Sequence, residues 1–527
     1  MTSSKAVRAA LTAALALGLV AAPASAAAAE PEAAQSQAAP IAWGKCAEDV
    51  LALIPVAERP KVSCANHPVP LDHSRANGAK IDIALMKRPA PDQSKKIGSL
   101  FINPGGPGGA GLRYAGFGAN FFTPEVMERF DLIGFDPRGV GRSTPLRCFK
   151  TSEEADAVFN RMYDVPVSKQ EIDSHMTATK DYTRACAQNA GPLLKHMATE
   201  DVARDLDLFR AGVGDKELTY VGFSYGTLLG ATYANLFPQR SRAIVIDGNV
   251  DPKLRTHNGT QYDRERAQGF EIALDGFLKR CDAVGPKCAL SGGARKKFDA
   301  LREAVKVKPV TLPNGTVVKY GDLIGRVAGN LYQPATFTAL AAWLQSIHAV
   351  LNPGVMVAQD APELAPAHNG RLDFLPLEDG PYLADDSYYG VNCTDKPFVR
   401  APQLFPFVAK RWERESPTFG RSQAASDLLT CASWPVPFPD RYSGPWNRKT
   451  KNPVVVVGNY YDPATQYEFA RRMARQLGNA RLISVDAFGH CILGKAAGAD
   501  AAVTRYLVDL KAPDNGQVFH PNVQPFA

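Results

Sequence analysis

Apolar strand-like runs alternate with helix-like segments in this chain, and this alternation is the feature that most restricts its fold. In the first half, short apolar runs typical of strands occupy 81–87, 98–102, 131–135, 218–221 and 243–247. Helical spacing of apolar residues occurs at 200–213 and 225–236. Strands that alternate with helices form a mostly parallel sheet covered on both faces. We therefore predict an α/β fold with a mostly parallel sheet flanked by helices.

The alternation stops near residue 251 and resumes near residue 445. The intervening stretch has helical patterns at 264–280, 295–306 and 336–351. Strands are again predicted at 453–458 and 481–485, with helices at 466–477 and 500–511. We therefore predict one α/β core, built from 40–250 and 445–527. A large, mainly helical cap insertion, 251–444, precedes its final two strands.

The first 26 residues have the pattern of a cleavable targeting segment rather than of a folded element. Lys5 and Arg8 precede an apolar run at 9–22, and Ala24-Ser25-Ala26 forms an A-x-A cleavage site. The apolar run is too short for a good membrane span. We predict a signal peptide at 1–26, a short pro-segment at 27–39, and a secreted, extracellular protein with no membrane span.

Secretion favours disulfides, because they persist in oxidising compartments. The chain has nine cysteines. We expect sequence neighbours to pair, which joins Cys46 to Cys64, Cys148 to Cys186, Cys281 to Cys288, and Cys393 to Cys431. Cys491 is left over, and we interpret it as a packing residue beside His490.

Composition excludes several classes of function. Hydrophobic residues make up 45% and charged residues 21% of the chain, which is typical of a globular protein. The net charge of +7 is spread over scattered basic residues, whereas nucleic-acid binding requires a clustered basic surface. The sequence has no P-loop, no H-E-x-x-H motif and no paired-cysteine zinc spacing. We therefore expect no nucleic-acid partner, no cofactor and no metal.

Gly222-Phe223-Ser224-Tyr225-Gly226 is a G-x-S-x-G motif between a predicted strand and a predicted helix. In this context the motif is typical of a nucleophile elbow, a sharp turn that exposes the serine at the carboxyl end of a sheet. A serine nucleophile needs a base that is oriented by an acid, and here the expected chain order is Ser, acid, His.

The last two predicted strands are each followed by a suitable partner for Ser224. Asp462 follows the strand 453–458, and His490 follows the strand 481–485. We therefore predict a catalytic triad of Ser224, Asp462 and His490. The rivals are Asp486, at a strand end, and His520, in a predicted C-terminal tail.

A glycine-rich loop, Asn103–Gly109, directly follows the strand 98–102. Acyl transfer requires N–H donors that point at the developing oxyanion. We assign one donor to the amide of Tyr225 and the other to an amide at Gly105 or Gly106.

The same loop also offers a dinucleotide-binding interpretation. Gly106–Gly111 has the pattern G-x-G-x-x-G after a strand, and Asp136 ends the next strand. We disfavour this alternative because it leaves the predicted triad unexplained.

Together these motifs resemble the α/β-hydrolase serine exopeptidases of the prolyl-aminopeptidase type, and in particular the secreted tripeptidyl aminopeptidases. The resemblance rests on Asn103–Gly109 (N-P-G-G-P-G-G), Asp136–Ser143 (D-x-R-G-x-G-x-S), Gly222–Gly226, Cys431–Pro435 (C-A-S-W-P) and the Asp462/His490 pair. Prolyl aminopeptidases have His where this chain has Pro104. The wider family often has D-x-x-T-P at the acid, whereas Gln466 follows Thr465 here. Both departures favour the tripeptidyl branch.

The resemblance implies release of short peptides, usually tripeptides and among them Pro-containing ones, from free N-termini of peptides or proteins. We expect the protein to be a monomer. Such a site must bind the substrate ammonium group with carboxylates at a fixed distance from the nucleophile. The cap insertion has acids among aromatic residues. Our candidates are Glu378, Asp385 and Asp395, the last because a disulfide at Cys393 would hold it.

Two other functions remain open. A carboxylesterase or lipase could use the same triad and acyl-enzyme, although a lipase cap would be more apolar. A catalytically idle binding protein would have the fold without the activity, which the intact triad and oxyanion loop argue against.

Overall fold

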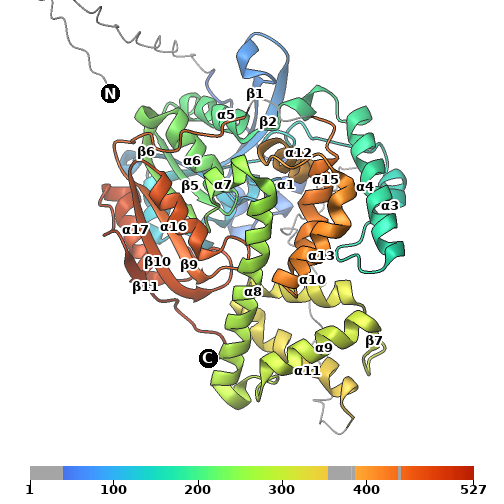
Figure 1. Cartoon of the computed structure of the whole chain (residues 1–527). Coiled ribbons are helices and arrows are strands. Elements are labelled where there is room, and N and C mark those ends of the chain that lie inside the picture. The colour runs from blue at the N-terminus through green and yellow to red at the C-terminus, as the bar shows by residue number, and fades with distance from the viewer. Residues whose placement is uncertain (1–38, 354–381, 383–385, 437–440) are drawn as a thin grey trace, which may run out of the picture. The chain divides into compact units, whose positions relative to one another are not determined.

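The computed structural model describes residues 39–353, 382, 386–436 and 441–527, so the predicted signal peptide lies outside the described residues. Its centre is a nine-stranded sheet with the order β1-β2-β4-β3-β5-β6-β9-β10-β11 (Figure 1). The strands are β1 (Ser63–Pro70), β2 (Lys80–Arg88), β3 (Gly98–Asn103), β4 (Phe130–Phe135), β5 (Leu218–Phe223), β6 (Ser241–Asp247), β9 (Val454–Tyr461), β10 (Ala480–Phe488) and β11 (Gln517–Phe519). The β1–β2 and β2–β4 pairs are antiparallel and the other pairs are parallel. The predicted α/β fold is therefore confirmed.

The two outer strands, β1 and β11, were not predicted from the sequence. The expectation of two strands after the insertion is wrong, because β11 adds a third, which pairs in parallel with β10. Its three residues are too few to show a period of two, and two of them are exposed. His520 follows this strand directly, in a region that the sequence suggested was a tail.

Consecutive residues of the central strands pack against opposite helical layers. In β9, Val454 and Val456 belong to one hydrophobic cluster, whereas Val455 and Val457 belong to another. The first cluster includes residues of α5 (Thr199–Gly212), α6 (Gly226–Leu236) and α16 (Tyr467–Gln476). The second includes residues of α2 (Pro124–Arg129) and α17 (Ala497–Asp509). Because helices cover both faces of the sheet, the central strands consist of continuous apolar runs.

The chain between β6 and β9 adds no described strand to the central sheet. We call residues 251–444 the cap segment. Its described helices are α7 (Pro252–His257), α8 (Gly259–Val284), α9 (Ala294–Val307), α10 (Tyr320–Leu331), α11 (Phe337–Leu351), α12 (Asp386–Asp395), α13 (Phe405–Glu415), α14 (Gly420–Gln423) and α15 (Leu429–Ala432), with a small hairpin of β7 (Val310–Thr311) and β8 (Val317–Val318). A π-helical turn, Ala424–Leu428, joins α14 to α15. In Figure 1, α9, α10 and α11 gather at the end of α8 that points away from the sheet.

The remaining helices precede the nucleophile strand or open the described chain. They are α1 (Glu48–Ala52), α3 (Ser152–Phe159) and α4 (Lys169–Asn189). The helix α4 begins with a capping box, in which Ser168 and Glu171 satisfy each other's backbone amides. It packs against α15 of the cap segment.

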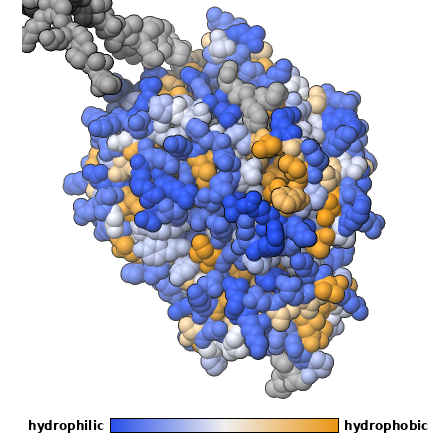
Figure 2. All heavy atoms as spheres, in the orientation of Figure 1, coloured by the Kyte–Doolittle hydropathy of each residue, from blue (hydrophilic) through white to orange (hydrophobic). Residues whose placement is uncertain are grey.

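Four disulfides form, and they are the four pairs expected from the sequence: Cys46–Cys64, Cys148–Cys186, Cys281–Cys288 and Cys393–Cys431. Cys491 is the free cysteine. No helix in the described part of the chain combines the length and the apolar character needed to cross a membrane. On the face shown in Figure 2, apolar side chains form small groups among hydrophilic ones.

Candidate active site

Ser224 lies in a strained turn between β5 and α6. Its φ of 54° is in the left-handed region, which residues other than glycine seldom adopt. The turn depends on the flanking glycines, because a Cβ at Gly222 would lie 2.3 Å from the carbonyl oxygen of Gly226. Strain of this kind is typical of functional sites. The predicted elbow motif therefore has the backbone geometry that the chemistry requires.

His490 and Asp462 are hydrogen-bonded to each other. His490 Nδ1 lies 2.9 Å and 2.8 Å from the two carboxylate oxygens of Asp462. The carboxylate also accepts the backbone N–H groups of Ala464 and Thr465, at 2.9 Å and 2.8 Å. Asp462 is buried. The buried acid is thus fixed from two sides, and it holds one edge of the imidazole.

The two rival residues are placed differently. Asp486 lies within β10 and His520 follows β11. Neither lines the cavity that contains Ser224 and His490.

Asp247, at the end of β6, connects the serine turn to the histidine loop. One carboxylate oxygen accepts the N–H groups of Ile492 and Leu493 at 2.7 Å and 2.9 Å. Its backbone carbonyl accepts the N–H of Ser224 at 2.9 Å and the thiol of Cys491 at 3.4 Å. Burial raises the pKa of Asp247 to about 6. This residue was not among the sequence predictions, although its position at a strand end was visible.

Cys491 fills the space between these elements. Its φ is 58°, and a Cβ at Gly248 would lie 2.7 Å from its sulfur. Burial raises the pKa of its thiol well above the ordinary value. The thiol therefore stays protonated at neutral pH, as a packing residue would.

The glycine-rich loop after β3 packs directly on the serine turn. A Cβ at Gly105 would lie 2.4 Å from the carbonyl oxygen of Phe223 and 2.9 Å from the amide of Tyr225. The amide of Gly105 itself donates to Asn103 Oδ1 at 2.9 Å. Gly106 and Tyr225 line the cavity and Gly105 does not. Of the two glycine amides considered, that of Gly106 is therefore the better placed.

The dinucleotide interpretation finds no support in this loop. The pattern Gly106–Gly111 is followed by a 3₁₀ helix, Leu112–Asn120, rather than by an α-helix. Asp136 is buried, and its carboxylate accepts the backbone amides of Leu112 at 2.9 Å and Arg142 at 3.0 Å. The acid that would hold a ribose is therefore committed to the protein backbone.

The D-x-R-G motif also has a structural role. Arg138 is fully buried and donates to both carboxylate oxygens of Asp205, at 2.8 Å and 2.7 Å. The same guanidinium donates to the carbonyls of Pro70, Leu71 and His196. It thus joins the end of β1 to the backbone that precedes α5.

The cavity at Ser224 has a volume of about 190 Å³ and is walled by both the core and the cap segment. Its core side includes Gly106, Ser224, Tyr225 and His490. Its cap side includes Tyr332, Tyr388, Tyr389, Asn392, Ala425 and Ser426. Asp164, in the loop between α3 and α4, is the one carboxylate among the described lining residues. Asp164 was not predicted from the sequence, because its loop shows no periodic pattern.

Of the three acids predicted to bind the substrate ammonium group, only Asp395 lies among the described residues, and it does not line this cavity. Glu378 and Asp385 lie outside the described residues. Asp395 is buried, and its carboxylate accepts the backbone amide of Thr199 at 3.1 Å and the Thr199 hydroxyl at 2.5 Å. Burial raises the pKa of Asp395. Its carboxylate therefore joins α12 to α5 rather than facing a ligand.

Comparisons with known proteins agree with this architecture. A family model described as "TAP-like protein" matches residues 416–518, and one described as "alpha/beta hydrolase fold" matches residues 98–279. The chain is 31% identical over 483 residues to tripeptidyl aminopeptidase of Streptomyces lividans, which covers 88% of this chain and 83% of that one. It is 30% identical over 476 residues to serine protease Hip1 of Mycobacterium tuberculosis, with 86% of each chain covered. It is also 30% identical over 512 residues to carboxylesterase B of the same organism, with 94% of each covered. The chain therefore belongs to the TAP-like family of α/β-hydrolases.

Proposed function

We propose that this protein is a secreted serine peptidase that releases short peptides, chiefly tripeptides, from free N-termini. The observation that carries the proposal is that strained Ser224 and Asp462-bound His490 share one cavity. The relatives named tripeptidyl aminopeptidase and serine protease Hip1 support a peptidase. The signal-like segment 1–26 and the four disulfides support secretion.

In the proposed mechanism, His490 is the general base. Its Nδ1–H donates to Asp462, which leaves Nε2 unprotonated and able to take the proton of Ser224. Ser224 Oγ attacks the scissile carbonyl, and His490 returns the proton to the leaving amine. The amides of Gly106 and Tyr225 stabilise the oxyanion. Water then hydrolyses the acyl-enzyme by the same route.

Asp164 is proposed to bind the substrate ammonium group. It is the carboxylate among the described residues of the cavity wall, and residues of the cap segment line the same cavity. An ammonium group bound at a fixed distance from Ser224 would determine how many residues are released.

Hydrolysis of tripeptidyl anilides with free and acetylated N-termini tests this proposal. Ser224→Ala should lower kcat by roughly 10⁴-fold or more. Asp164→Asn should raise KM for the free-N-terminal substrate about 10- to 100-fold, the contribution of one charged hydrogen bond, and leave the acetylated one nearly unchanged. The matched control is Asp156→Asn, which removes an exposed acid of α3. Equal effects of Asp164→Asn on both substrates would refute the assignment.

A carboxylesterase is the second candidate, because carboxylesterase B matches this chain over 94% of its length. Both reactions pass through an acyl-enzyme on the same serine. Comparison of p-nitrophenyl esters with tripeptidyl anilides separates the two. Rapid ester hydrolysis together with indifference to N-terminal acetylation would favour the esterase.

A further inference from the structure

Two guanidinium groups lie in the cavity wall beside the candidate nucleophile. Arg255, at the end of α7, is only 3% exposed, and Arg266, in α8, is 17% exposed. Arg255 lies over the ring of Tyr225, the residue that follows Ser224, at 5.7 Å. Burial raises the pKa of Tyr262 to about 12, and the positive charges of Arg255 and Arg266 both oppose this rise. The two cations are therefore neighbours in the wall.

Among the described residues, Arg255 has no carboxylate within ion-pair distance, and Arg266 has one, Asp263, near the limit of that distance. Arg255 donates to Asn392 Oδ1, and its Nε is buried without any hydrogen-bond acceptor in the described part of the chain. Arg266 lies 3.9 Å from the carboxylate of Asp263, and its charge lowers the pKa of the buried Tyr332 hydroxyl, which burial raises. A buried donor of a charged group that lacks a partner is costly, and a bound ligand can remove that cost.

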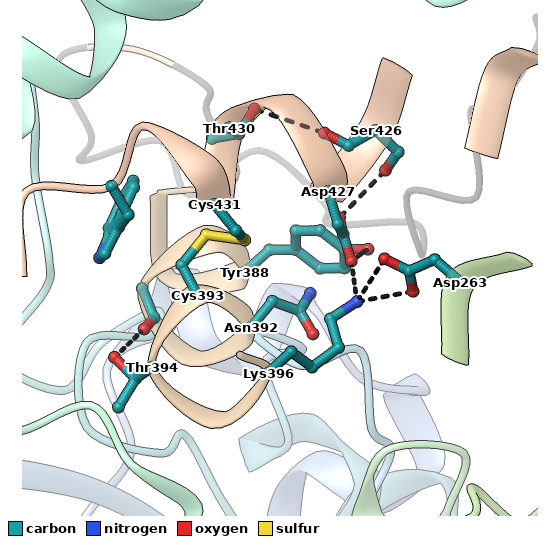
Figure 3. The surroundings of a disulfide bond; sticks show 12 residues. Asp263, Tyr388, Asn392, Cys393, Thr394, Lys396, Ser426, Asp427, Thr430 and Cys431 are labelled. Carbon is teal, nitrogen blue, oxygen red and sulfur yellow. Dashed lines mark hydrogen bonds and ion pairs between the residues drawn. A yellow bond between two sulfur atoms is a disulfide. The ribbon is translucent and has the colours of Figure 1, made fainter. Parts of the chain in front are cut away.

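Three carboxylates act electrostatically on the two arginines: Asp263, Asp395 and Asp427. Each of them accepts a hydrogen bond from another donor, and none of them lines the cavity. Figure 3 shows the ammonium group of Lys396 between Asp263 and Asp427. Asp427 also accepts hydrogen bonds from Tyr388 at 3.3 Å and from Ser426 at 3.1 Å. Apart from Asp164, the carboxylates near the two arginines therefore lie behind the cavity wall, whereas both guanidinium groups line it.

We infer that Arg255 and Arg266 form an anion subsite that binds a side-chain carboxylate in the acyl part of the substrate. The preferred substrate is then a peptide with Asp or Glu among the residues that are released. A carboxylate accepts guanidinium N–H groups and compensates their charge, whereas a neutral carbonyl only accepts hydrogen bonds. This inference rests on the proposed function and names the substrate class of that site.

A panel of tripeptidyl anilides tests the subsite. Each of the three positions carries in turn Glu, its neutral isostere Gln, or Lys, with Ala elsewhere. At one of the three positions, the wild-type enzyme should have a kcat/KM for the Glu peptide that is about 10- to 100-fold higher than for the matching Gln peptide. Arg255→Gln or Arg266→Gln should reduce this Glu/Gln ratio toward one, and Arg266→Lys should restore part of it.

The matched control is Arg264→Gln, two residues from Arg266 in the same helix. Arg264 pairs with Glu415 at 2.6 Å and does not line the cavity. The Arg264→Gln substitution removes the same positive charge as Arg266→Gln, but the Glu/Gln ratio should stay at its wild-type value. Because the ratio compares two substrates in one preparation, it does not depend on how much of a variant is folded. Absence of a Glu preference at every position in the wild-type enzyme would overturn the inference.

A second substrate series separates failure of the subsite from failure of the peptidase proposal. It uses p-nitrophenyl esters of acyl chains that end in either a carboxylate or a methyl group. If anilides are not cleaved but the anionic esters are preferred, and Arg266→Gln abolishes that preference, the subsite stands and the peptidase proposal fails. If anilides are cleaved without any Glu preference, the peptidase proposal stands and the subsite fails.

Discussion

At the scale of single residues, backbone atoms fix the candidate catalytic groups before any substrate binds. The N–H of Ser224 is held by the carbonyl of Asp247, and Asp462 is held by the amides of Ala464 and Thr465. Rigid placement of this kind lowers the reorganisation that a reaction requires. The loop that would complete the oxyanion site depends in addition on one glycine, Gly105, because it packs against the serine turn without a side chain.

Substitution of Gly105 by Ala should therefore damage the chemistry more than the fold. Its Cβ would lie 2.8 Å from Ser224 Cβ and 2.4 Å from the carbonyl oxygen of Phe223, which would push the loop away from the turn. We expect kcat to fall by about 10²–10³-fold, the usual effect of losing one oxyanion donor, with little change in KM. The control is Gly214→Ala, which has a similar φ of +85° but nothing within 4 Å of the new Cβ. Equal losses of kcat in the two variants would contradict this role of Gly105.

The residues of the proposed triad could be selected from the sequence because Ser224, Asp462 and His490 each follow a predicted strand. Asp164 and Arg255 could not, since they come from a loop and a short helix without a periodic pattern. Only the packing of the cap segment on the core brings them to the cavity. Asp395 illustrates the converse case, because its neighbouring cysteine was visible in the sequence but its hydrogen bonds to Thr199 were not.

At the scale of elements, the apolar strands of the core were predictable and the short helices of the cap were not. The run Val454–Val457 indicates a strand buried on both faces. Neither α12 (Asp386–Asp395) nor the π-helical turn (Ala424–Leu428) has an amphipathic pattern. Both segments are buried on nearly all sides, so no face of them requires polar residues. The Cys393–Cys431 disulfide joins α12 to α15, next to that turn. The helix α12 and the π-helical turn both contribute lining residues to the cavity.

Removal of this disulfide by a double Cys393→Ser, Cys431→Ser substitution should lower both stability and substrate binding. The bridge closes a loop of 38 residues, so its loss should cost about 4 kcal/mol in the free energy of unfolding. KM should rise as well, because α12 is no longer tied to α15, the helix that directly follows the π-helical turn. The control removes Cys46–Cys64, whose loop of 18 residues predicts a loss of about 3 kcal/mol. That bridge does not border the cavity, so its removal should leave KM unchanged. Denaturant titration measures the free energy of unfolding of each variant, and steady-state kinetics measures its KM. An unchanged KM in both variants would show that the bridge does not shape the site.

At the scale of the whole molecule, the cap and the core share buried structure and do not behave as separate bodies. Phe526, near the C-terminus, packs against Phe277 and Phe337 of the cap segment, with ring centroids 6.0 Å and 6.2 Å apart. His175 of α4 makes a second connection. Its Nδ1 accepts the amide of Tyr163 at 3.0 Å, and its Nε2 donates to the carbonyl of Ala425 at 3.2 Å. It therefore links the loop that carries Asp164 to the π-helical turn of the cap.

This link should make stability depend on pH. Burial lowers the pKa of His175 from 6.5 to about 4, so between these values the unfolded chain binds a proton that the folded protein does not. The contribution of neutral His175 to the free energy of unfolding is fully present above pH 6.5. It falls by about 3 kcal/mol as the pH decreases from 6.5 to about 4. Denaturant titrations of the wild type and of His175→Gln across this range should give a difference in unfolding free energy that shrinks by that amount on acidification. The control, His257→Gln, removes an exposed imidazole and should give a nearly constant difference. A pH-independent difference for His175→Gln would mean that the imidazole is not held neutral at the junction of core and cap.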